Sequence, residues 1–131
     1  MSKRFQFGKF QGNLALFALG LLSASSFCQT ARADCDEMSN FAEKRGIYVP
    51  GDDSERQVIG EGRLQFYSAP DEKCKMPGIF ILPKEKLNAY FEYEKYTSVI
   101  YINPKTNVRA SGWVKSDRLR STGVGIAPHQ Q

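Results

Sequence analysis

Short apolar runs separated by brief turn sequences fill the chain between residues 57 and 120. Residues 79–82 form a continuous apolar run, which is typical of a buried strand. Residues 87–93 and 96–102 follow as two partner strands joined by the short turn Glu94-Lys95. A parallel connection needs about a dozen residues or more, and these turns are too short for one. The pattern therefore predicts a mainly β protein whose antiparallel sheet closes into a small barrel.

Residues 87–93 alternate between apolar and polar side chains. Successive side chains of a strand point to opposite faces, so one face should be core and the other wet. The predicted core face holds Leu87, Ala89, Phe91 and Tyr93. The predicted wet face holds Asn88, Tyr90 and Glu92.

The first 33 residues have the pattern of a secretory signal peptide. Lys3, Arg4 and Lys9 precede an apolar run at 14–22, and Ala31-Arg32-Ala33 supplies a cleavage site with small residues. The run is shorter than the roughly 20 residues of a membrane span. We expect cleavage after Ala33, a periplasmic or secreted bacterial protein, and no stable membrane insertion.

Cys28 raises the alternative of a lipid anchor, because a cysteine after an apolar run can be acylated. A lipoprotein signal has a small residue before that cysteine, whereas this chain has the bulky Phe27. Cleavage after Ala33 is therefore the preferred interpretation.

Removal of residues 1–33 changes the charge of the protein. The whole chain has 18 basic and 14 acidic residues, and its first 33 residues contain four of the basic ones and none of the acidic ones. The remaining chain is neutral overall. A nucleic-acid partner is therefore not expected.

Cys35 and Cys74 are the two cysteines that remain after cleavage. An even number of cysteines in a small exported domain favours a disulfide between them. The spacing of apolar residues from Cys35 to Ala42 predicts a short helix that ends near Gly46, and an irregular arm is the alternative. Residues 34–56 would then form a helix or arm tied by the disulfide to a barrel at 57–120, with a flexible tail at 121–131.

Catalytic and metal sites find little support in the residue types. The only histidine, His129, lies in the tail, where no base is held against a nucleophile. Both remaining cysteines are assigned to the disulfide, so no transition-metal site and no cofactor are expected. Glu92 and Glu94 could in principle act as an acid and base pair, but nothing nearby would keep either one protonated. We expect no enzymatic activity.

Segment 111–119 contains the only tryptophan of the chain, Trp113, between Gly112 and Val114, and it ends in a polar turn at Leu119. This Gly-Trp-Val step with its closing turn resembles the end of bacterial SH3-like domains, and the resemblance spans residues 60–119. It implies a small SH3-like barrel in which exposed rings line a groove for an extended peptide.

The aromatic rings expected at this binding surface are Tyr67, Tyr90, Tyr96 and Trp113, with Trp113 partly in the core. Tyr90, Glu92 and Glu94 would share one face, and Tyr96 would follow across the next turn. Two rings would then flank two carboxylates, a combination that suits a basic side chain of a partner.

The resemblance implies two kinds of partner. SH3-like domains outside the cytoplasm often bind cell-wall peptide, usually beside a hydrolase domain or in tandem, and this sequence shows neither. We therefore expect a non-catalytic protein that binds another protein, as an inhibitor or immunity protein against a wall-degrading toxin or hydrolase. Binding of the peptidoglycan stem peptide is the alternative.

Overall fold

The computed structural model describes residues 27–126, which form one α-helix and eight strands. The elements are α1 (Phe27–Arg45), β1 (Ile47–Tyr48), β2 (Glu55–Val58), β3 (Leu64–Tyr67), β4 (Lys75–Ile81), β5 (Lys86–Tyr93), β6 (Tyr96–Ile102), β7 (Arg109–Lys115) and β8 (Leu119–Ser121). Three short 3₁₀ turns are η1 (Gly51–Asp53), η2 (Glu72–Cys74) and η3 (Ser116–Arg118). The predicted fold class, mainly β with an N-terminal helix, is confirmed.

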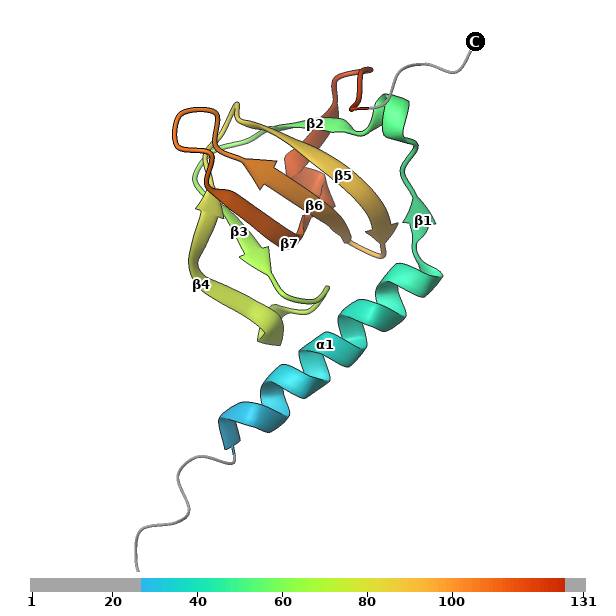
Figure 1. Ribbon diagram of the computed structural model, residues 1–131, viewed down its shortest axis with the longest axis vertical. Helices are drawn as coiled ribbons and strands as arrows, with labels where there is room; N and C mark the ends of the chain where they lie inside the picture. Colours follow the sequence, from blue (N-terminus) through green and yellow to red (C-terminus); the bar gives the residue numbers. More distant parts are fainter. Residues whose placement is uncertain (1–26, 127–131) are drawn as a thin grey trace, which may run out of the picture.

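The strands form one curled antiparallel sheet, and α1 lies on the outside of the curl (Figure 1). The strand order is β4-β3-β7-β6-β5-β2-β8, and β1 pairs with β5. The inside of the curl holds the main hydrophobic core, which includes Val58, Phe66, Ile81, Val99 and Val114. A second, smaller core of Ala42, Tyr67, Tyr96 and Trp113 lies between α1 and the outer face of the sheet.

A β-bulge in β5 determines which side chains reach each core. Ala89 pairs with Val99 of β6, but Phe91 pairs with the next residue back, Ser98, so Tyr90 is an extra residue in the register. Leu87 and Ala89 consequently belong to the inner core, whereas Phe91 and Tyr93 pack against the outer one. The prediction of a single core face for residues 87–93 is therefore wrong, because a period of two does not reveal an inserted residue.

Strand β4 is an edge of the sheet and is strongly bent (Figure 1). Its pairing with β3 is interrupted between Gln65 and Tyr67, opposite the stretch that contains Pro77. The side-chain amide of Gln65 donates to the carbonyl oxygens of Met76 at 2.6 Å and Ile79 at 3.0 Å. The side chain thus supplies hydrogen bonds where the regular ladder is broken.

Helix α1 is longer than predicted and begins at Phe27, before the predicted cleavage site after Ala33. Cleavage there would shorten its N-terminal end and leave the part from Cys35 to Ala42 in place. The alternative of an irregular arm is thereby ruled out. No helix among residues 27–126 is long and apolar enough to cross a membrane.

The structure describes only part of the two predicted terminal segments, the signal peptide and the flexible tail. Residues 1–26, which make up most of the predicted signal peptide, and residues 127–131, with His129, lie outside the described residues. Residues 121–126 continue along β2, where the N–H of Glu55 donates to the carbonyl of Val124 at 2.9 Å. This part of the predicted flexible tail is thus attached to the sheet.

The sulfur atoms of Cys35 in α1 and Cys74 in η2 are 2.02 Å apart, so the predicted disulfide is confirmed. The bond joins residues 39 positions apart in the sequence. It fixes the middle of α1 to the loop that precedes β4.

Replacement of both cysteines by serine should lower the free energy of unfolding by about 4 kcal/mol, because the open chain gains loop entropy when it unfolds. Helix α1 should lose hydrogen-exchange protection before the sheet does, since Ala42 is its only fully buried residue among those described. Urea unfolding and amide exchange of the double variant measure the two effects. Equal protection of α1 in the variant and the oxidised protein would contradict this expectation.

Candidate binding cleft beside helix α1

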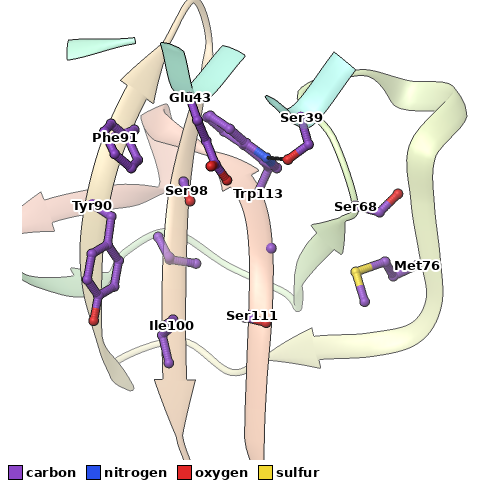
Figure 2. A pocket seen from close by; sticks show the side chains of 12 residues that line it. Ser39, Glu43, Ser68, Met76, Tyr90, Phe91, Ser98, Ile100, Ser111 and Trp113 are labelled. Atoms are coloured by element: carbon purple, nitrogen blue, oxygen red, sulfur yellow. Dashed lines mark hydrogen bonds between the residues drawn. The ribbon is translucent and has the colours of Figure 1, made fainter. Parts of the chain in front are cut away.

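A cleft of about 400 Å³ lies between α1 and the outer face of β5, β6 and β7 (Figure 2). We call it the α1 cleft. Its lining side chains come from six parts of the chain and include Glu43 of α1, Ser68 after β3, Met76 of β4, Tyr90 and Phe91 of β5, Ser98 and Ile100 of β6, and Ser111 and Trp113 of β7.

Small residues on the sheet create the space of the α1 cleft. Ser98, Ser111 and Gly112 form part of the lining and leave space under the helix. Gly112 is required where it stands, because a Cβ atom there would lie 2.6 Å from the carbonyl oxygen of Tyr67. The bulge in β5 adds a wall, since it brings Tyr90 and Phe91 to the same side of the strand (Figure 2).

Trp113 forms the inner wall of the cleft and connects it to the outer core. Its side chain is 1% exposed, and its indole N–H donates to Oγ of Ser39 in α1 at 2.9 Å. The sequence predicted Trp113 only partly in the core, whereas its ring is fully buried there. Most of the ring is therefore unavailable to a ligand, and its main effect is to hold α1 above the sheet.

Tyr67 and Tyr96 lie together but do not form an open groove. They are 6% and 8% exposed, and their rings meet edge to face with centroids 5.4 Å apart. Both hydroxyl groups donate to the carboxylate of Glu72, at 3.1 and 3.3 Å. Burial is the main reason why the pKa of each phenol is raised.

Glu72 joins these tyrosines to Lys115, with which it forms an ion pair. The hydrogen bond from Lys115 is the main cause that lowers the pKa of Glu72. Glu72 belongs to η2 and lies two residues before Cys74. The network therefore fixes the loop that carries the disulfide.

The two predicted carboxylates lie outside the α1 cleft. Glu92 pairs across strands with the buried Thr97, so it points to the face opposite Tyr90, and its Oε1 lies 3.9 Å from Arg56. Glu94 is exposed in the turn between β5 and β6, with φ of 52°. The predicted patch of two rings around two carboxylates is therefore not formed, because the bulge separates Tyr90 from Glu92.

Glu43, Met76 and Phe91 line the cleft, although the sequence did not indicate them as site residues. Glu43 follows Ser39 by four positions and Cys35 by eight, so the three share one face of a helix. That spacing could have indicated Glu43, but only once the disulfide and Trp113 had placed this face over the sheet.

A second hollow of about 560 Å³ lies beside Glu72 and is lined by Lys95, Tyr96, Lys115, Ser116 and Asp117. Its acidic and basic side chains balance one another, and Glu72 and Lys115 are already paired. Within the described part of the chain, no three His, Cys, Asp or Glu side chains are grouped in a way that could hold a metal ion.

Comparison with protein-family models, with curated proteins and with solved structures finds no match to this chain. The resemblance to bacterial SH3-like domains therefore stays a prediction from Gly112-Trp113-Val114 and Leu119.

Trp113→Ala should lower the free energy of unfolding by about 3–5 kcal/mol, because it removes the largest buried ring and leaves a cavity under α1. Tyr90→Ala should cost less, since Tyr90 is only half-buried. Urea unfolding followed by far-UV circular dichroism compares the two variants. A larger loss for Tyr90→Ala would show that Trp113 is not the main support of this face.

Glu72→Gln should lower the melting temperature at neutral pH, because it removes the charge that pairs with Lys115. The pKa of Glu72 is lowered from 4.5, so the stabilisation is present above that pH and is lost as the wild-type carboxylate is protonated at lower pH. The difference between wild type and variant should therefore narrow as the solution is acidified. The exposed Glu61 has no hydrogen bond or ion pair with another described residue, so Glu61→Gln is the control. Its melting temperature should match that of wild type at each pH.

Proposed function

We propose that this protein is a non-catalytic, exported binding protein that holds a segment of a partner protein in the α1 cleft. The observation that carries the proposal is the cleft itself, where the half-buried rings of Tyr90 and Phe91 face small serine side chains. The hydroxyl groups of Ser98 and Ser111 make no hydrogen bond to another described residue. The cleft thus offers apolar contact and free hydrogen-bonding groups together.

An aromatic surface extends from the cleft toward the end of α1. The ring of Tyr48 in β1 meets Phe91 edge to face at 5.8 Å, and Phe41 of α1 meets Tyr93 at 6.3 Å. Tyr48 is 62% exposed and Phe41 is 50% exposed. Exposed aromatic residues are enriched where proteins bind each other, so this surface favours a protein partner over a small molecule.

The charges in the cleft favour binding over catalysis. Of the described residues that line it, Glu43 is the only carboxylate, and none is histidine, lysine or cysteine. General acid and base catalysis needs a positioned group with a suitable pKa, commonly with a second group to complete the proton transfer. An inhibitor or immunity protein of a wall-degrading enzyme needs only complementary contacts, which such a cleft provides.

Filling the cleft tests the proposal. Ser111→Trp places a large ring at an exposed position of the lining, and Arg109→Trp adds the same ring two residues earlier on the same strand, outside the lining. Immobilised wild type and the Arg109 variant should capture the same envelope protein, and the Ser111 variant should bind it at least tenfold more weakly. The affinity is measured by titration with that purified protein.

Purified peptidoglycan serves as the competing ligand in the same assay. Wild type should stay in solution when peptidoglycan is sedimented. If wild type and the Arg109 variant sediment with peptidoglycan and the Ser111 variant does not, the ligand of the cleft is the wall peptide and not a protein.

A further inference from the structure

We infer that the α1 cleft selects a lysine or arginine side chain of the bound protein segment, and that Glu43 is the carboxylate that receives it. The inference rests on the proposed function and adds the chemistry of the bound side chain. It places the acidic contact on α1, whereas the sequence indicated Glu92 and Glu94 of the β5 region.

Among the described residues that line the cleft, Glu43 carries the single formal charge. Figure 2 shows its side chain directed from α1 toward the space above Ser98 and beside Trp113. Glu43 has no hydrogen bond or ion pair with any other residue in the described part of the chain. Its carboxylate is exposed to water in the free protein and is available to an incoming cation.

No basic side chain among residues 27–126, including the adjacent Lys44, forms an ion pair with Glu43. The guanidinium of Arg45 lies over the ring of Phe41, 5.0 Å from its centroid, on the aromatic surface beyond the cleft. Arg56 is nine-tenths buried and contacts Asp53 and Glu92. The cleft therefore presents a negative charge that no described side chain pairs with.

The remaining lining suits the apolar stem of a long basic side chain. Tyr90, Phe91 and Ile100 supply two rings and an aliphatic group along the way to Glu43. Lysine and arginine bury their methylene groups against such surfaces while the charged end reaches a polar partner. A cation near the two rings gains a further electrostatic attraction.

The same arrangement disfavours other side chains. A neutral apolar side chain would fill the hollow but would displace water from the Glu43 carboxylate without replacing its hydrogen bonds. An acidic side chain would in addition be repelled by that carboxylate. Selection by charge therefore follows from one exposed residue on α1.

The test uses three acetylated and amidated pentapeptides that differ only at the central residue, which is lysine, norleucine or glutamate, with glycine elsewhere. The single tryptophan gives one indole N–H signal that reports on the cleft in a ¹H–¹⁵N titration. The lysine peptide should shift this signal and the amide of Ser98 with a dissociation constant at least tenfold lower than that of the norleucine peptide.

Glu43→Gln should remove this preference for lysine. Glu94→Gln is the matched control, because Glu94 is also an exposed acid without a partner among the described residues but lies outside the cleft. The Glu94→Gln variant should prefer the lysine peptide as strongly as wild type does. Glu43→Lys should reverse the preference and bind the glutamate peptide better than the lysine peptide, which would show direct contact.

The outcomes separate the two proposals. Binding of the lysine and norleucine peptides in the cleft with equal affinity, unchanged by Glu43→Gln, would overturn the inference and leave a cleft that binds polypeptide without charge selection. Absence of any shift at Trp113 and Ser98 with all three peptides would overturn the inference and the proposed function together. Because Glu43 is exposed, the ¹H–¹⁵N spectra of its variants should otherwise match wild type, which confirms that they are folded.

Discussion

The disulfide between Cys35 and Cys74 is the constraint on which the binding face depends. Helix α1 has little buried surface of its own, and of its described side chains only Ala42 is fully enclosed. The covalent bond lets such a helix stay against the sheet, where it covers Trp113 and forms one wall of the cleft. A helix with so few contacts would otherwise hold its position weakly.

The loop that carries Cys74 is itself held in place by a polar network. Glu72 accepts hydrogen bonds from Tyr67 and Tyr96 and pairs with Lys115, so three strands converge on the 3₁₀ turn before Cys74. The tyrosines that resembled groove residues thus stabilise the attachment point of the helix. The network holds η2, and the disulfide attaches α1 to η2. Helix α1 in turn places Glu43 over the cleft.

Local patterns in the sequence were sufficient for the fold class, most of the strands and the disulfide, because each depends on residues close together or on a single possible pair. The apolar run at 79–82 did not form the predicted buried strand, since Ile79, Phe80 and Leu82 are exposed at a sheet edge, and β8 was not predicted. The faces of β5 were not predictable, since the bulge at Tyr90 arises from how β5 meets β1 and β6. That one residue moved Phe91 to the outer core and Glu92 away from Tyr90. The sequence alone could not assign Glu43 to a site, because the cleft is formed by residues distant in sequence. The assignment needs the position of α1 on the sheet.

The bent edge strand β4 has a consequence for behaviour at high concentration. An open strand edge with Ile79 and Phe80 exposed is a template on which a second chain could add a strand. Here Pro77 lacks an N–H group, the bend at Met76 to Ile79 prevents a straight partner from aligning, and the guanidinium of Arg63 covers the ring of Phe80 at 4.2 Å. An irregularity in one strand thereby disfavours the addition of a further strand to this apolar edge.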